Sequence, residues 1–285
     1  MATLEEFKRR QIEILHELDR VCGIVGIDYY LAYGTCLGAV RHRGFIPWDD
    51  DIDVFLLHDG MEKLIENRHL FGEQYFLQGL ETEENFTLMK HNLRDSSTSY
   101  FSDADDVEDI NHGMYIDLYT LYPYPDGLIA AHKLIIDVYI CQLLLLKRPP
   151  LHHGAFGRVL FGLAKAMYPG QRAARKISVV FDKLRNNGGR RFYASFYGDD
   201  ITPVSCMRFP QSLFKEPTRL WFEDYNAPCP TSPEQACVVM FGERYMEFPP
   251  EEQRVSRHQV RYMSCEHPYV DFLGTYYRKD ENSVV

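Results

Sequence analysis

The segment Gly44-Phe-Ile-Pro-Trp-Asp-Asp-Asp-Ile-Asp-Val-Phe-Leu-Leu57 is the strongest indicator of fold and chemistry in this chain. It sets four aspartates, at positions 49, 50, 51 and 53, against an apolar run. Crowded carboxylates repel one another and resist burial, so a cation is expected to hold them. A divalent metal is the usual partner, and a metal beside a glycine turn indicates phosphate chemistry.

Two of these acids are expected to face the same way. Residues 51–57 have the pattern of a β-strand, in which alternate side chains share a face. Asp51 and Asp53 would then point together, with Cα atoms roughly 7 Å apart, while Ile52 and Val54 point to the core. Such a pair can converge on one metal, or on two metals about 4 Å apart.

A calcium loop of the EF-hand type does not fit this segment. Asp49, Asp51 and Asp53 match its first, third and fifth positions, but Val54 and Gly60 stand where glycine and glutamate are needed. A merely solvated acidic turn explains poorly why apolar residues are interleaved with the acids. A metal site is therefore the favoured interpretation.

A third carboxylate is expected from a distant strand. His112 to Leu121 reads as an apolar strand in which Asp117 is the only acid. An isolated acid in a buried strand is either paired or functional. Asp117 is thus the natural companion of Asp51 and Asp53.

A glycine turn precedes the acids. Residues 27–33 predict a short strand that runs into Gly34 and Thr35, fourteen residues before Asp49. The pair alone is weak evidence and could be only a tight bend. Followed by a strand that carries Asp-x-Asp, it matches nucleotidyltransferase-type folds, in which the turn's amides and hydroxyl hold phosphates while the acids hold metal.

Cationic and aromatic side chains surround these motifs. Arg41 is favoured as a phosphate ligand, although it could simply neutralise aspartates. His42 is a weaker candidate for a general base. Trp48 is expected to be a packing anchor, or to stack on a base or a quaternary ammonium. Lys90 fits a phosphate role and a plain ion pair about equally.

Composition limits the classes of protein. The 285 residues are 45% hydrophobic and 14% aromatic, enough for a substantial core in one or two domains. The formal net charge of -10 argues against nucleic-acid binding. The charged N-terminus lacks the apolar core of a signal peptide. The cysteines are scattered, which predicts reduced thiols in a cytoplasm. The cysteines stand at positions 22, 36, 141, 206, 229, 237 and 265.

The remaining pattern predicts an α+β chain. Leu4 to Cys22 has helical periodicity, with Gly23 and Gly26 as terminators, and residues 86–90 are expected to add a strand. Residues 128–146 are long enough to span a bilayer but contain charges, which favours a buried or interfacial helix. Residues 147–191 contain eleven Lys/Arg and one acid, a local charge of about +10 that suggests contact with an anionic membrane surface or simply a solvated face.

At the level of whole motifs, the chain closely resembles the LicD family, which is related to fukutin-type phosphotransferases. The resemblance is strongest over residues 1–122 and loose in the basic middle region. Two departures, Cys36 and Leu118-Tyr-Thr-Leu121, remove no carboxylate. The matching motifs are Tyr33-Gly-Thr-Cys-Leu-Gly-Ala-Val-Arg-His42, the acidic segment above, Met89-Lys90, His112-Gly-Met-Tyr-Ile-Asp-Leu118 and Tyr245-Met-Glu-Phe-Pro-Pro250.

The resemblance implies a fold, an activity and a site. It implies a nucleotidyltransferase-like mixed sheet flanked by helices, in a catalytic core over residues 1–122. A helical, loop-rich region over residues 123–285 is expected to pack on the core and to bind the acceptor.

The resemblance also implies an activity. A phospho-alcohol, with phosphocholine favoured, is transferred from a CDP-linked donor to a sugar hydroxyl, and CMP is released. The acceptor is a cell-surface glycan precursor such as teichoic acid or lipopolysaccharide. The carried-over metal ligands, for Mg²⁺ or alternatively Mn²⁺, are Asp51, Asp53 and Asp117, and Gly34 and Thr35 contact phosphate.

Other interpretations stay open at this point. A nucleotidyltransferase that forms a nucleotide-activated compound would release pyrophosphate instead of CMP, and a non-catalytic protein on the same fold would only bind nucleotide or metal. Choline, ribitol and glycerol are all compatible donor alcohols. The expected location is the cytoplasm, with the inner face of the membrane as the place of contact through residues 147–191.

Overall fold

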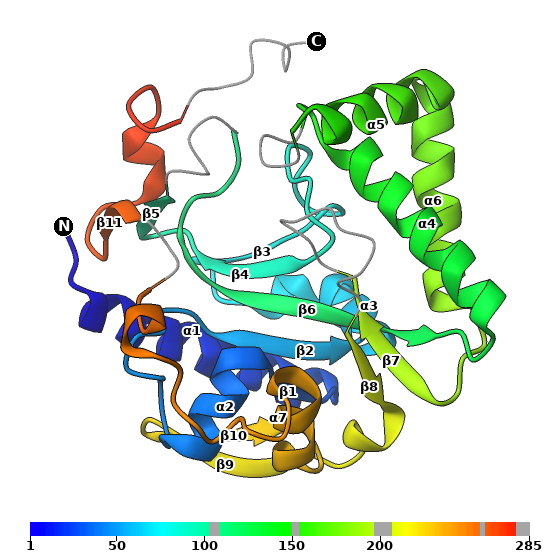
Figure 1. The fold of residues 1–285 in the computed structure, drawn as a ribbon. Coiled ribbons are helices and arrows are strands. Elements are labelled where there is room, and N and C mark those ends of the chain that lie inside the picture. Colours follow the sequence, from blue (N-terminus) through cyan, green and yellow to red (C-terminus); the bar gives the residue numbers. More distant parts are fainter. Residues whose placement is uncertain (103–108, 150–153, 197–206, 257–259, 278–285) are drawn as a thin grey trace. The chain divides into compact units, whose positions relative to one another are not determined.

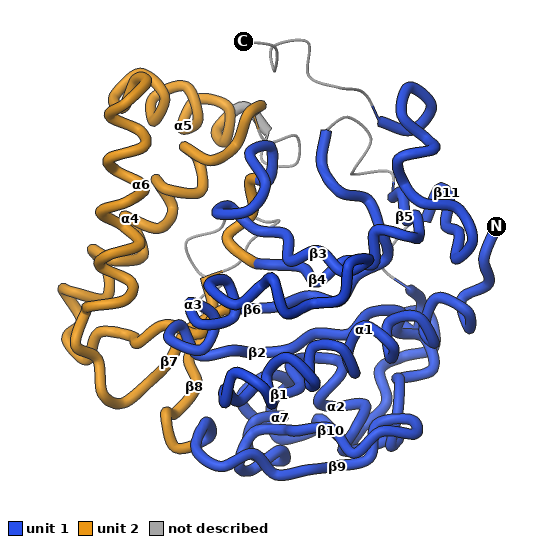
Figure 2. The backbone as a smooth tube through the Cα atoms, turned by 180° about the vertical axis from the view of Figure 1, so that it is seen from behind, with its two compact units in different colours: residues 1–86, 91–119, 213–285 blue, residues 87–90, 120–212 orange. Residues whose placement is uncertain are grey.

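A computed structural model describes residues 1–102, 109–149, 154–196, 207–256 and 260–277 (Figure 1). Helices and a mixed sheet occur together along the chain, which confirms the predicted α+β class. By its contacts the chain divides into two compact units (Figure 2). Unit 1 comprises residues 1–86, 91–119 and 213–285, and unit 2 comprises residues 87–90 and 120–212. Residues 213–285 therefore group with the N-terminal part of the chain.

The first helix of unit 1 forms where its apolar periodicity predicts. α1 (Leu4–Val25) begins at a capping box, in which Thr3 Oγ1 accepts from the Glu6 amide at 3.2 Å and Glu6 accepts from the Thr3 amide at 2.8 Å. It ends at Gly26, whose φ of 72° favours glycine. Gly23 lies inside the helix, so its expected role as a terminator was wrong. The face that α1 buries includes Phe7, Ile14, Leu15, Leu18 and Val21.

The sheet of unit 1 has the strand order β1-β2-β6-β4-β3. Neighbours β1 and β2, β6 and β4, and β4 and β3 are antiparallel. The predicted strand over 86–90 was wrong, because the Phe86 amide donates to Glu83 O in a turn and the strand starts only at His91. The strand bounds are β1 (Tyr29–Leu31), β2 (Asp53–Leu57), β3 (Tyr75–Gln78), β4 (His91–Asp95) and β6 (Met114–Tyr124).

The rest of unit 1 consists of short elements. Two further antiparallel pairs form, β9 with β10 and β5 with β11. The bounds are α2 (Tyr33–Arg41), α3 (His58–Glu66), η1 (Arg68–Leu70), β5 (Ser99–Ser102), β9 (Thr218–Phe222), β10 (Tyr225–Cys229), α7 (Pro233–Phe241), η3 (Glu251–Gln253), β11 (Val260–Ser264) and η4 (Tyr269–Phe272). The short helix η2 (Gln211–Leu213) crosses the boundary, since residues 211 and 212 belong to unit 2.

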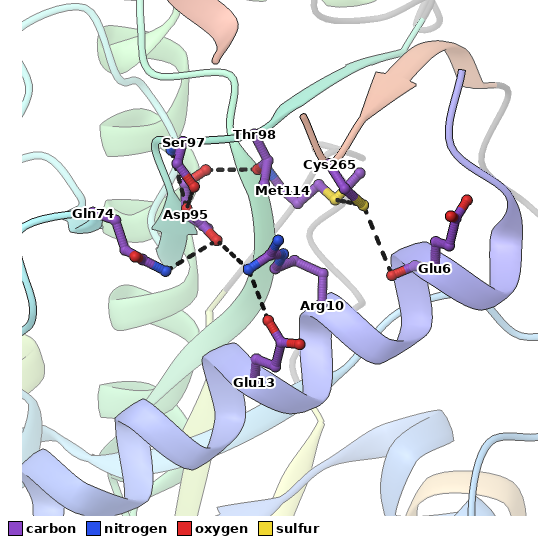
Figure 3. A network of polar contacts seen from close by, with 9 residues as sticks. All are labelled: Glu6, Arg10, Glu13, Gln74, Asp95, Ser97, Thr98, Met114 and Cys265. Carbon is purple, nitrogen blue, oxygen red and sulfur yellow. Dashed lines mark hydrogen bonds and ion pairs between the residues drawn. The ribbon is translucent and has the colours of Figure 1, made fainter. Parts of the chain in front are cut away.

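An ion pair ties α1 to β4 (Figure 3). Asp95 on β4 has a fully buried side chain, and Arg10 on α1 reaches it at 3.3 Å while also pairing with Glu13 at 2.7 Å. Ser97 donates to Asp95 through its hydroxyl at 2.6 Å and its amide at 3.0 Å, and Gln74 donates at 3.4 Å. A buried charge needs such partners, so this network holds the helix on the sheet.

Unit 2 combines three helices with the end of the sheet. The C-terminal residues of β6 pair with β7 (Phe192–Ser195), which pairs with β8 (Arg208–Pro210). The helices are α4 (Leu128–Leu145), α5 (Gly154–Met167) and α6 (Gln171–Arg185). Val138 and Cys141 of α4 pack with Val180 and Leu184 of α6 in one buried cluster.

Helix α4 is the one helix of the described chain that is long and apolar enough to cross a membrane, and a third of its residues are buried. Its charged residue Asp137 pairs with Lys176 and Lys183 of α6. These contacts, with the buried cluster, show one face of α4 packed within unit 2.

Candidate metal centre

Three carboxylates meet in unit 1. Asp51, Asp53 and Asp117 each offer an oxygen, and these oxygens all lie within 4.8 Å of one another. Asp53 and Asp117 are 6% and 5% exposed, and Asp51 is partly buried. The predicted trio is thus brought together from two segments that are 64 residues apart in sequence.

The acidic segment reaches this position by a path slightly different from the predicted one. β2 begins at Asp53, so the predicted strand start at Asp51 was two residues early. The reason is the pairing with β1, in which Val54 is the first residue of β2 to have a partner, Leu31. Ile52 and Val54 are nevertheless fully buried, as the alternation predicted.

Asp117 is positioned by the sheet. Its amide donates to Ile52 O at 2.8 Å, which links β6 to the acidic segment. The Tyr119 hydroxyl donates to Asp117 Oδ2 at 3.4 Å. Asn92 lies directly opposite Asp117 on β4. In the orientation in which the Asn92 side-chain oxygen faces Arg94, the Asn92 amide nitrogen donates to Asp117 Oδ1 at 2.7 Å. Sequence reasoning missed both partners. Tyr119 could have been found by strand alternation from Asp117, whereas Asn92 carries no signal without the register.

Gly34 and Thr35 lie in the first turn of helix α2, not in a free turn after a longer strand. The predicted strand over 27–33 is shortened to Tyr29–Leu31. Thr35 is 2% exposed, and its hydroxyl accepts from the Asp53 amide at 2.8 Å. A Cβ added to Gly34 would lie 2.3 Å from Asp49 Oδ2, so a larger residue there would have to displace the Asp49 carboxylate. The helix start therefore abuts the acids, and its leading N–H groups suit an anion.

Arg41 and His42 lie at the other end of α2, about 10 Å along the helix from Gly34. Arg41 donates to the carbonyls of Tyr245 and Glu247 at 3.0 and 3.2 Å, and to His42 Nε2 at 2.9 Å. Burial and the Arg41 charge lower the pKa of His42. In this structure the guanidinium of Arg41 thus donates hydrogen bonds to backbone carbonyls. The phosphate role of Arg41 and the general-base role of His42 stay predictions.

Trp48 belongs to an aromatic cluster beside the acids. Its ring lies 6.0 Å from that of Phe248 and 6.5 Å from that of His42. Arg254 lies over both the Trp48 and the Phe248 rings, and Ser256 donates to Asp50 Oδ2 at 2.7 Å. Residues 245–256 therefore pack onto the acidic segment. Sequence reasoning matched residues 245–250 but had no signal for Arg254 or Ser256.

Two other residues noted in the sequence, Lys90 and Cys36, are both buried. Lys90 is buried and groups with unit 2, directly before β4. Hydrogen bonds with Cys229 and Cys237, together with burial, raise the pKa of the Cys36 thiol well above its usual value. None of the six described cysteines forms a disulfide.

A cavity of about 720 Å³ opens along α1 in unit 1. Its lining includes Lys8, Phe45 and Glu223. Burial lowers the pKa of Lys8, while the charges of Asp49 and Asp50 act to raise it. The volume falls in the range of small-molecule sites.

The donor set of the acidic trio fits a hard divalent cation. Carboxylate oxygens are the ligands that Mg²⁺ and Mn²⁺ prefer, and the trio offers three from one small region. Asp49, Asp50 and Asp51 form a second such group. The fold and this site define the chain as an α+β protein with a carboxylate centre suited to a divalent metal.

Comparison with known proteins identifies a family domain within the chain. Residues 26–133 match the family model described as LicD/FKTN/FKRP, nucleotidyltransferase domain. The chain is 39% identical over 83 residues to the lipopolysaccharide cholinephosphotransferase LicD of Haemophilus influenzae, which covers 29% of this chain and 31% of that protein. An uncharacterised protein of Rickettsia prowazekii is 54% identical over 33 residues, 12% of each chain. The family match thus assigns residues 26–133 to the LicD family domain, and the matched segments span about a third or less of these relatives.

Proposed function

We propose that the protein transfers a phospho-alcohol, with phosphocholine favoured, from a CDP-linked donor to a sugar hydroxyl of a cell-surface glycan precursor, and releases CMP. The observation that carries this is the convergence of Asp51, Asp53 and Asp117 beside the start of α2 in a LicD family domain. The name of the Haemophilus influenzae relative supports phosphocholine and a lipopolysaccharide acceptor.

In this reaction the acceptor oxygen bonds to the phosphorus that bears the alcohol, and the bond from that phosphorus to CMP breaks. A bound Mg²⁺ or Mn²⁺ would supply charge neutralisation on the donor diphosphate and the leaving phosphate. The leading N–H groups of α2 at Gly34 and Thr35 would bind a phosphate oxygen. Asp117 would accept the hydroxyl proton or help to hold the metal, with its carboxylate oriented by Asn92 and Tyr119. The cavity along α1 is the place we assign to the acceptor sugar.

A donor screen tests the proposal. The protein is incubated with Mg²⁺ and CDP-choline, CDP-ribitol or CDP-glycerol, and nucleotide products are identified by mass spectrometry. We expect CMP from at least one donor, fastest from CDP-choline, loss of turnover with EDTA and recovery with excess Mg²⁺. Pyrophosphate from a nucleoside triphosphate, or binding of CDP-alcohols without any CMP, would contradict the proposal and favour the nucleotidyltransferase or the non-catalytic alternative.

We propose that a surface of unit 2 contacts the membrane. Four large apolar side chains of α5 are exposed at helical spacing: Phe156, Val159, Leu163 and Met167, at 74%, 57%, 53% and 62%. The opposite face of the helix packs inward through Ala164. Exposed basic residues occur on α5, on α6 and after α4, among them Lys147, Arg148, Arg158, Arg172 and Arg175. An apolar helix face in a basic region of the chain suits an anionic lipid surface.

Vesicle binding checks this membrane contact. We expect the protein to sediment with vesicles that contain about a third phosphatidylglycerol, and the combined change Phe156→Ser and Leu163→Ser to reduce the bound fraction at least about tenfold, because each residue contributes its buried apolar area. The control is Val270→Ser with Leu273→Ser, two exposed apolar residues of unit 1. Equal binding to pure phosphatidylcholine, or equal loss in the control, would refute the contact.

A further inference from the structure

The aromatic cluster beside the acids already holds a cation between two ring faces. The guanidinium carbon of Arg254 lies 5.6 Å from the Trp48 ring centroid and 5.4 Å from that of Phe248. The two rings are 6.0 Å apart and inclined at 64°. Aromatic faces attract cations through their quadrupoles, and paired faces are the usual way that proteins bind quaternary ammonium groups.

A third ring completes the site. His42 lies 5.8 Å from Phe248 and 6.5 Å from Trp48. Because burial and the neighbouring Arg41 lower the pKa of His42, its ring is neutral at neutral pH and adds no charge that would repel a cation. His42, Trp48 and Phe248 are called the aromatic triad below.

The triad adjoins the candidate metal centre. Trp48 directly precedes Asp49, and Asp50 accepts from Ser256, two residues after Arg254. A ligand that spans the two places would carry a cationic group close to a phosphate. Arg41 also contacts the Phe248 ring, at 4.9 Å, so a zwitterionic headgroup with its own phosphate is favoured over a bare cation.

The two arginines are held to different degrees. Arg41 donates to two backbone carbonyls and to His42, which fixes it at the end of α2. Arg254 donates through Nε to the carbonyl of Pro249, five residues away in the same loop. Of the two arginines, Arg254 is therefore the one that a ligand can displace, because its long side chain can swing away from the rings.

We propose that the aromatic triad binds the quaternary ammonium group of the donor, and that Arg254 occupies this place until the donor displaces it. This inference rests on the proposed function, whose donor it specifies as a choline compound. Arg254 then sets selectivity, because a ribitol or glycerol group carries no charge with which to replace the guanidinium. Removing Arg254 should tighten binding, whereas removing a ring face should weaken it.

The chain offers a direct optical test. It contains two tryptophans, Trp48 and Trp221, and Trp221 is an exposed residue of β9. In a Trp221→Phe background, Trp48 fluorescence reports on the triad alone. We expect phosphocholine to change it saturably, and glycerol phosphate to bind at least about tenfold more weakly. Phe248→Leu, which keeps apolar bulk but removes the ring face, should raise the Kd for phosphocholine about 3- to 30-fold, and Arg254→Ala should lower it about 3- to 10-fold.

Control variants separate this from a structural role. Phe241→Leu, an exposed aromatic residue at the end of α7, should leave the Kd unchanged. Thermal melting of each variant establishes that it is folded. The inference is overturned if Arg254→Ala weakens binding as Phe248→Leu does, or if folded Phe248→Leu binds like the parent.

Turnover assays distinguish this inference from the proposed function. If CMP is released but Phe248→Leu slows CDP-choline and CDP-ribitol equally, the triad assignment fails while the function stands. If Trp48 responds to phosphocholine as expected but no donor yields CMP, the binding site stands and the transferase function fails.

Discussion

Replacing Asp53 with asparagine is expected to lower the rate of CMP release from CDP-choline by about 10²- to 10³-fold or more, the loss typical when a group that supports charge in the transition state is removed. The side chain is 6% exposed and shares a 4.8 Å region with Asp51 and Asp117. Asparagine keeps the shape but removes one of three charges from the donor set, so divalent-cation affinity falls with activity.

The same change should not destabilise the metal-free protein. Asp53 lies among other carboxylates, and removing one negative charge relieves repulsion. We therefore expect an unchanged or higher Tm in EDTA. Mg²⁺ should raise the Tm of the parent, because a ligand that binds only the folded state stabilises it, and this rise should shrink or vanish in Asp53→Asn.

The measurements are CMP release by mass spectrometry and thermal melting with and without Mg²⁺. Asp28→Asn is the matched control, since Asp28 is exposed directly before β1 and lies outside the acidic trio. If Asp53→Asn melts normally, responds to Mg²⁺ as the parent does and turns over at the parental rate, the metal centre is misassigned.

Replacing Arg10 with alanine is expected to cost about 3–5 kcal/mol of unfolding free energy, the range for a buried charge that loses its partner. Asp95 is fully buried, and Arg10 lies 3.3 Å from it. Ser97 and Gln74 would still donate to Asp95, so we expect a value toward the lower end of that range. Urea denaturation followed by far-UV circular dichroism gives the free energy.

A neighbouring arginine and a second substitution complete this test. Arg9→Ala removes an exposed residue of the same helix and should change stability by no more than about 0.5 kcal/mol. Adding Asp95→Asn to Arg10→Ala removes the stranded charge and should recover part of the loss. A cost for Arg10→Ala no larger than that for Arg9→Ala would show that the pair does not hold α1 on β4.

Local pattern was sufficient for the elements that carry the site. The periodicity of residues 4–22 predicted α1, the apolar run around Asp117 predicted β6, and alternation around Asp53 predicted that Ile52 and Val54 would be buried. These features depend on near neighbours in the chain, where helical and strand spacing applies directly. The strand expected over 86–90 was wrong, because the Phe86 amide donates within a turn and not to a neighbouring strand.

The sequence by itself selected three of the many acids of the chain. The alternation of a β-strand indicated Asp51 and Asp53, and Asp117 was the only acid in an apolar strand. Only the tertiary structure decided their surroundings: Asn92 opposite Asp117, Arg41 on the carbonyls of residues 245 and 247, and Arg254 between Trp48 and Phe248. The physical reason is that these contacts join segments up to 206 residues apart, and strand order and loop path, which no local spacing encodes, bring them together.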